Sequence, residues 1–165
     1  MTITAHIVLG LDPGLASVGW AVISAVGTAR QLIDCGTIHT PSTDTDDERA
    51  RVIGERVAGL LACHSPDVVG VEAHVWMGAT RSANPEAFRV SRVSGLLEGL
   101  AVASKAHVHR VTRRDALAAV GARTEDGANA TLRRIMKLPA RCSQHARDAA
   151  LIAIAAEKAE RRKMS

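Results

Sequence analysis

The sequence predicts an α/β fold, with a five-stranded mixed sheet and helices packed on both of its faces. Two observations support this prediction. Three short apolar segments separated by turn residues open the chain, and helical and extended patterns then alternate toward the C-terminal end. The first arrangement is typical of an antiparallel meander, whereas the second is typical of parallel strands joined by helices. The 165 residues suit one core, so residues 1–165 are expected to form a single domain.

Short apolar runs bounded by turn residues predict the strands. They are expected at residues 6–12, 17–24, 30–39, 68–72 and 107–111. Val26-Gly27-Thr28 supplies the turn between the second and third strands, and Pro66-Asp67 breaks the chain before the fourth. The first and fourth strands share a pattern, because each apolar run ends in a carboxylate.

Apolar residues that recur every three or four positions predict the helices. They are expected at residues 48–63, 85–104, 114–120 and 129–137, and from residue 143 onward. Ser143 is a suitable N-cap for the last of these. Its inward-facing residues are expected to be Ala149, Leu151, Ile152 and Ile154.

Charge is distributed unevenly along the chain. The net charge is +4, but residues 1–72 carry four Lys and Arg against nine Asp and Glu, whereas residues 73–165 carry seventeen against eight. A basic half of this size favours a polyanionic partner such as nucleic acid, although a solvated arginine-rich surface has the same composition. The uncharged stretches are short and the N-terminal end lacks a signal pattern, so a soluble cytoplasmic protein with no membrane partner is expected.

The cysteines and aromatic residues are few. Cys35, Cys63 and Cys142 are odd in number and widely spaced, which favours reduced core residues over a disulfide framework or a zinc site. Trp20 and Phe88 are expected to fill the core as well.

Asp12 and Glu72 each end an apolar strand. A carboxylate in that position is compatible with a simple turn or a solvated strand end. If the two strands are parallel neighbours, however, both carboxylates lie at one edge of the sheet, where two anions repel each other unless a cation lies between them. Oxygen ligands of this kind suit Mg²⁺.

His145 and Asp148 extend this set. They are three residues apart near the start of the last helix, hence on one helical face. Taken alone they are compatible with an acidic helix start and a surface histidine. Together with Asp12 and Glu72 they form an acidic cluster able to hold two metal ions, as in phosphodiester hydrolysis.

Four segments follow one another in a specific order. They are Leu9-Gly10-Leu11-Asp12-Pro13-Gly14 with Gly19, Val71-Glu72 before Val75-Trp76-Met77, Lys137-Leu138-Pro139, and His145-x-x-Asp148-Ala149. In order and spacing, over nearly the whole chain, they resemble the RuvC family of Holliday junction resolvases. The resemblance implies a ribonuclease H-like fold, a homodimer and Mg²⁺-dependent nicking of four-way DNA junctions in two symmetrically placed strands. A branch-migration helicase is a further partner by family analogy.

The resemblance also assigns roles to residues. Asp12, Glu72, His145 and Asp148 match the four catalytic, metal-binding positions, which would hold two Mg²⁺ ions. Some members have an aspartate where this chain has His145, and imidazole makes Mn²⁺ a possible substitute for Mg²⁺. We therefore expect His145 either to bind a metal ion or to relay a proton. Trp76 matches an aromatic residue that stacks on a base at the junction centre, although it could instead be a core residue.

Basic residues are the expected contacts to DNA phosphates. They are Arg110, Arg113, Arg114, Arg133, Arg134, Lys137 and Arg141. The chain departs from the family at one point, since the family commonly has a lysine near the start of the helix that contains Gly127, where this chain has Glu125 and Asp126. Arg113 or Arg114 could replace another family lysine.

A stripe of small residues marks the helix expected at residues 85–104. It consists of Ser91, Gly95, Gly99 and Ala103. The stripe could pack against the domain's own sheet, but we expect it to approach a second copy of the chain.

Three other functions share features with the sequence. A sugar kinase of the actin-like type needs two lobes and more residues, while a less selective branched-DNA nuclease and a non-catalytic junction-binding module stay as alternatives.

Overall fold

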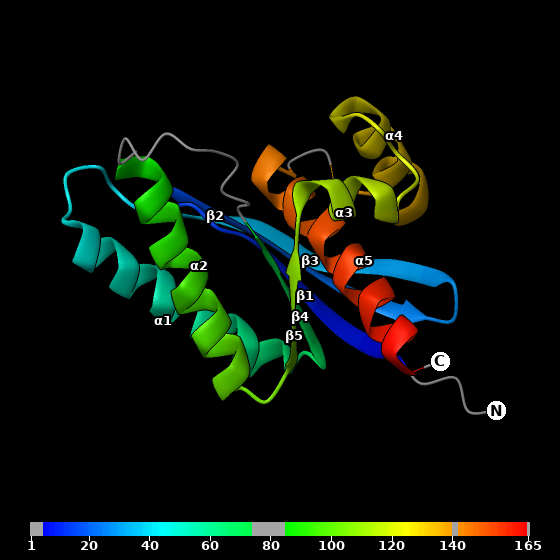
Figure 1. The fold of residues 1–165 in the computed structure, drawn as a ribbon, viewed down its shortest axis with the longest axis horizontal. Coiled ribbons are helices and arrows are strands. Elements are labelled where there is room, and N and C mark those ends of the chain that lie inside the picture. Colours follow the sequence, from blue (N-terminus) through cyan, green and yellow to red (C-terminus); the bar gives the residue numbers. More distant parts are fainter. Residues whose placement is uncertain (1–4, 74–84, 140–141, 165) are drawn as a thin grey trace, which may run out of the picture.

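The computed structural model describes residues 5–73, 85–139 and 142–164. Its strands are β1 (His6–Asp12), β2 (Ser17–Val26), β3 (Ala29–His39), β4 (Val68–Glu72) and β5 (His107–Val111). Its helices are α1 (Asp46–His64), α2 (Pro85–Ala103), α3 (Arg113–Ala119), α4 (Glu125–Met136) and α5 (Gln144–Met164). Figure 1 shows these elements in chain order.

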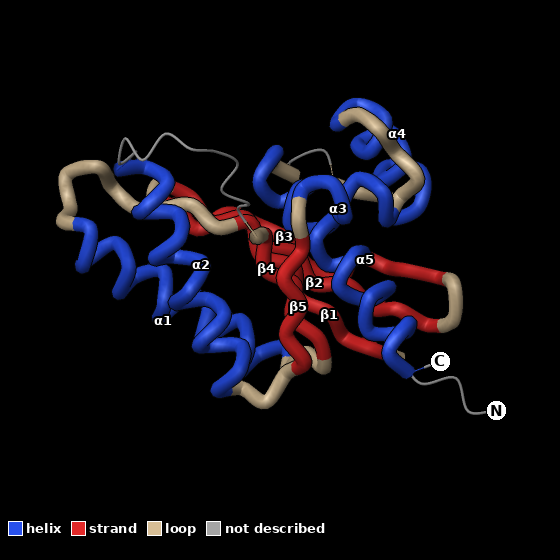
Figure 2. Tube along the Cα trace, in the orientation of Figure 1, coloured by secondary structure: helices blue, strands red, loops and turns tan. Residues whose placement is uncertain are grey.

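The strands form one mixed sheet in the order β3-β2-β1-β4-β5. The meander β1-β2-β3 is antiparallel, whereas β4 runs parallel to both β1 and β5. Helices α1 and α2 cover one face, and α3, α4 and α5 lie on the other, as Figures 1 and 2 show. The predicted five-stranded mixed sheet with helices on both faces is therefore confirmed.

Helices α1 and α4 begin at least two residues earlier than their apolar pattern predicts, because a threonine caps each of them. Helix α1 begins at Asp46, where Thr45 and Glu48 form a reciprocal capping box. Helix α4 begins at Glu125 instead of residue 129, because Thr124 accepts a hydrogen bond from the Gly127 amide. Polar residues at the start of a helix have the same composition as a loop, so the hydrophobic pattern alone predicts a helix start that is too late.

The core predictions are wrong for two side chains. Phe88 lies in the first turn of α2 and is 71% exposed, because it faces away from the buried residues Val93 and Leu97. Cys63 is exposed in the last turn of α1. Trp20 is half-buried and packs against the core between the sheet, α1 and α2, while Cys142 is buried.

Helix α5 is the central element of the second face. Every residue of this helix from Ala149 to Glu157 is buried, so the predicted inward-facing positions are confirmed. A close approach of helix and sheet makes this possible, since a Cβ added to Gly10 of β1 would lie 1.9 Å from the carbonyl oxygen of Ala149. Neither α5 nor any other helix in the described residues is long and apolar enough to cross a membrane.

Two buried carboxylates fix the C-terminal half of α5 to the sheet. Glu157 accepts a hydrogen bond from Arg30 of β3 at 2.6 Å. Glu160 pairs with His109 and His107 of β5, each at 2.6 Å, and these hydrogen bonds lower the pKa of Glu160. The helix that carries His145 and Asp148 is thus held along its whole length.

Candidate active site

The first turn of α5 is anchored on the meander. Ser143 accepts a hydrogen bond from the Ala146 amide at 3.1 Å, which confirms it as the N-cap. Its hydroxyl also lies 2.6 Å from the Thr37 hydroxyl of β3. A Cβ on Gly19 of β2 would lie 2.1 Å from the carbonyl oxygen of His145, so only glycine lets the helix approach this closely. These contacts place His145 at the end of β1.

Asp12 and Glu72 lie side by side, as their pattern predicts. Strands β1 and β4 are parallel and Leu11 pairs with Val71, so the next residue of each strand ends at the same edge of the sheet. Burial, a hydrogen bond with Asp12 and the charge of Asp12 raise the pKa of Glu72 to about 7, although Arg113 partly offsets this. The two carboxyl groups therefore resist carrying two negative charges at the same time.

His145 completes one side of this site. Its Nδ1 lies 2.8 Å from the Asp12 carboxylate, and its Nε2 lies 3.1 Å from the Ser17 hydroxyl. The side chain of Asp12 is 13% exposed and that of His145 is 49% exposed, so the imidazole lies between the buried carboxylate and solvent. Asp12 and Ser17 together fix the orientation of the ring.

Asp148 lies on the other side, beside an arginine. Arg113, the first residue of α3, pairs with Asp148 at 2.9 Å and with Glu125 at 2.6 Å. Burial opposes the charge of Arg113, but its hydrogen bonds to Glu125 and Asp148 raise its pKa. Gln144 donates to both carboxylate oxygens of Asp148, at 3.0 and 3.2 Å.

The four side chains offer the donors that a hard divalent cation prefers, namely three carboxylates and one imidazole. Burial and the neighbouring Asp12 raise the pKa of Glu72, so ionisation of both carboxyl groups is disfavoured unless a cation lies nearby. In the part of the chain that the structure describes, no three His, Cys, Asp or Glu side chains are arranged to hold an ion as they stand. Arg113 pairs with Asp148 and His145 pairs with Asp12, so these two contacts have to open before a cation is bound. The donor chemistry and charge fit a divalent ion under that condition.

The structure places the predicted DNA-binding residues in two groups. Arg110, Arg113 and Arg114 lie at the end of β5 and the start of α3. Arg113 pairs with Asp148, whereas Arg110 pairs with Glu98 of α2 at 2.7 Å. Arg133, Arg134 and Lys137 are exposed at the C-terminal end of α4. Trp76 and Arg141 lie outside the described residues.

Sequence reasoning missed three residues of the site. Ser17, Gln144 and Glu125 contact His145, Asp148 and Arg113 respectively, through the contacts given above. Gln144 was detectable, since it lies four residues before Asp148 on one helix. Ser17 and Glu125 belong to other elements, and no local pattern points to them.

Glu72 provides a test of the charge balance in the metal-free protein. Its pKa is raised in the folded state, so the folded protein keeps a proton that the unfolded chain has already lost between about pH 4.5 and 7. The stability contributed by Glu72 therefore falls as pH rises through this window. We expect Glu72→Gln to raise the melting temperature at pH 8 in the presence of a chelator, with a smaller effect at pH 4.5. Glu55→Gln, at an exposed pair on α1, is the control; equal pH profiles for wild type and Glu72→Gln would contradict this account.

Comparison with known proteins identifies a family for this chain. The chain matches the family model of the crossover junction endodeoxyribonuclease RuvC over residues 8–156. RuvC of Azorhizobium caulinodans is 43% identical over 65 residues, which cover 39% of this chain and 38% of the relative. RuvC of Natranaerobius thermophilus is 32% identical over 91 residues, which cover 55% of this chain and 54% of the relative.

The fold agrees with a solved structure. The structure of T. thermophilus RuvC in complex with a Holliday junction substrate has a TM-score of 0.82 and 23% identity, and covers 95% of this chain and 96% of that chain. The aligned segments span only 38% and 54% of the two curated relatives named above. The family model nevertheless covers most of the residues, including Asp12, Glu72, His145 and Asp148. The protein belongs to the RuvC family of crossover junction endodeoxyribonucleases.

Proposed function

We propose that this protein is a structure-specific endodeoxyribonuclease that resolves Holliday junctions by metal-dependent nicks in two symmetrically placed strands. The observation that carries the proposal is the meeting of Asp12, Glu72, His145 and Asp148 at one edge of the sheet, in a chain of the RuvC family. The T. thermophilus RuvC of similar fold was solved with a Holliday junction substrate.

In the proposed reaction, water adds to the scissile phosphorus and one P–O bond breaks. Asp12, Glu72 and Asp148 would hold two Mg²⁺ ions through carboxylate oxygens, with His145 as a further ligand or as the group that accepts a proton from the attacking water. Divalent ions bound there supply charge stabilisation for the phosphoryl oxygens and a more acidic water. Mn²⁺ would be a substitute, because carboxylate ligands suit it as they suit Mg²⁺. Ser17 and Gln144 orient His145 and Asp148.

The junction arms are proposed to contact the basic residues around the site. Arg113 pairs with Asp148, and the next residue of α3, Arg114, is exposed. Further along the same face of the sheet, the exposed basic residues are Arg133, Arg134 and Lys137. Each phosphate contact adds a salt-dependent contribution to affinity. Trp76 and Arg141 are proposed to contribute base stacking and a phosphate contact.

A synthetic mobile four-way junction tests the function directly. The purified protein is incubated with this junction and with a linear duplex of the same sequence, in Mg²⁺, in Mn²⁺ and in chelator. Paired nicks in the junction alone, only with a metal ion, support the proposal. Nicks in the linear duplex as well indicate a less selective nuclease, and tight junction binding without nicks indicates a binding module.

A homodimer is part of the proposal, since two symmetric nicks need two sites. Ser91, Gly95, Gly99 and Ala103 are all exposed on α2, and a Cβ on either glycine would meet no atom within 4 Å. The stripe therefore does not pack against the domain's own sheet. Phe88 and Val102 are exposed on the same helix and extend the apolar surface.

A charge on this stripe should prevent the two copies from associating. We expect Gly95→Glu to convert the dimer to a monomer in analytical ultracentrifugation at micromolar concentration, because a symmetric interface brings the two added charges together. Gly59→Glu is the matched control, because Gly59 is an exposed glycine on α1 with no atom near its Cβ position. A monomeric wild type, with and without junction DNA, would exclude the dimer.

A further inference from the structure

Two cysteines from distant parts of the chain lie in contact next to the first turn of α5. Cys35 is on the edge strand β3 and Cys142 lies two residues before α5. Their sulfur atoms are 3.4 Å apart. A disulfide bond has an S–S length of about 2.05 Å, so its formation would draw the two sulfurs together by about 1.4 Å. Such proximity makes oxidation within one chain possible without a large rearrangement.

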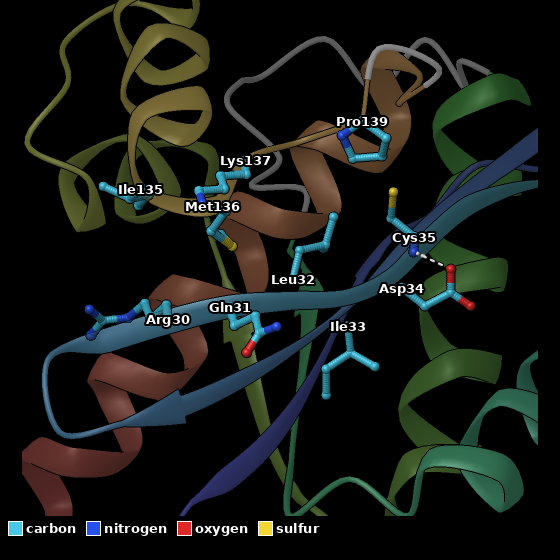
Figure 3. A pocket seen from close by; sticks show the side chains of 10 residues that line it. All are labelled: Arg30, Gln31, Leu32, Ile33, Asp34, Cys35, Ile135, Met136, Lys137 and Pro139. Carbon is cyan, nitrogen blue, oxygen red and sulfur yellow. Dashed lines mark hydrogen bonds between the residues drawn. The ribbon is translucent and has the colours of Figure 1, made fainter.

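The two thiols differ in their access to solvent. Cys35 lines a cavity of about 510 Å³ between β3 and the C-terminal end of α4, together with Met136, Lys137 and Pro139. Figure 3 shows the Cys35 side chain in this cavity, on the side of Pro139. Cys142 is only 6% exposed, and burial together with a hydrogen bond from Cys35 raises its pKa. A small oxidant thus reaches Cys35 first.

We propose that Cys35 and Cys142 are a modification site, at which a hydroperoxide oxidises the pair to an intramolecular disulfide that slows the nuclease. The Cys35 thiol loses its proton and the thiolate attacks one peroxide oxygen. The O–O bond breaks, Cys35 becomes a sulfenic acid, and the other oxygen takes up that proton and leaves as water or an alcohol. The Cys142 sulfur then attacks the Cys35 sulfur. The S–S bond forms, and the hydroxyl of the sulfenic acid leaves as water with the proton of Cys142. Two electrons pass from the sulfurs to the peroxide.

The position of Cys142 connects this bond to the candidate active site. Its carbonyl oxygen accepts a hydrogen bond from Arg147 at 2.7 Å, and the next residue, Ser143, is the N-cap of α5 and contacts Thr37 of β3. Contraction between β3 and Cys142 therefore acts on the turn that carries His145. A displacement of about 1 Å at catalytic groups can cost about 10²-fold in rate, so we expect the oxidised protein to nick at least tenfold more slowly.

The experiment uses the full chain with Cys63→Ser, which removes the exposed thiol and with it disulfides between molecules. The protein is treated with hydrogen peroxide, and its free thiols are counted under denaturing conditions. The expected result is a fall from two thiols to none, a loss of two hydrogens in mass, a peptide pair linked through Cys35 and Cys142, and full reversal by dithiothreitol. Cys35→Ser and Cys142→Ala are separate controls, each expected to form no intramolecular link and to keep its nicking rate after peroxide treatment without reduction.

The outcomes distinguish the formation of the disulfide from its effect on the nuclease. Two thiols remaining after treatment, or oxidation to sulfinic acid without a link, would overturn the site. A linked protein that nicks as fast as the reduced one would overturn the effect on the nuclease. The effect on nicking depends on the proposed function, whereas the mass and the thiol count do not. A reduced protein without nicking activity would refute the proposed function, but the disulfide could still be detected.

Discussion

Asp12→Asn is expected to slow nicking of the four-way junction by about a thousandfold, because the loss of one carboxylate ligand removes several kcal/mol of transition-state stabilisation. Asp12 lies at the centre of the site, since it contacts both His145 and Glu72. The amide is neutral and binds a divalent ion poorly. The substitution also removes the negative charge that orients the imidazole of His145.

Junction affinity should persist or rise in Asp12→Asn, because one negative charge near the DNA phosphates is lost. Nicking is measured by single-turnover kinetics in Mg²⁺, and binding by electrophoretic mobility shift in chelator. Asp34→Asn is the control, since Asp34 is exposed on β3 and an asparagine oxygen can still accept the hydrogen bond from the Cys35 amide. A decrease in nicking below tenfold would remove Asp12 from the proposed chemistry.

Gly10→Ala should destabilise the protein by at least about 3 kcal/mol, although it adds only one methyl group. The added Cβ would lie 1.9 Å from the Ala149 carbonyl oxygen and 2.7 Å from the Ala153 amide nitrogen. Both atoms belong to the backbone of α5, so no side-chain rotation relieves the overlap. The helix has to move away from β1, and the contacts of its buried face are weakened.

A glycine-to-alanine substitution at Gly59 should have the opposite effect on the free energy of unfolding. Gly59 is an exposed residue within α1, and a Cβ there would meet no atom within 4 Å. Gly59→Ala should therefore stabilise the protein by up to about 1 kcal/mol through helix propensity. Urea unfolding of both variants measures the difference, and a Gly10→Ala variant as stable as wild type would show that α5 does not approach β1 this closely.

The positions of the elements were largely predictable, because apolar periodicity reports local burial. The strands at residues 6–12, 68–72 and 107–111 agree with the structure, whereas α1 and α4 begin earlier than predicted. Their starts are set by hydrogen bonds of Thr45 and Thr124, which the hydrophobic pattern does not record. Phe88 was misplaced for a related reason, since its apolar character does not indicate which face of α2 it occupies.

The mixed sheet, the family and the meeting of the four residues at one sheet edge could be predicted from the sequence alone. How those residues are held depends on tertiary contacts: His145 contacts Asp12 across 133 positions of sequence, and Arg113 joins Asp148 to Glu125. The tertiary structure also brought Cys35 to Cys142. The physical reason is that periodicity depends on each segment's own burial, whereas these contacts depend on how closely α5 packs on the sheet, which the glycines of β1 and β2 permit.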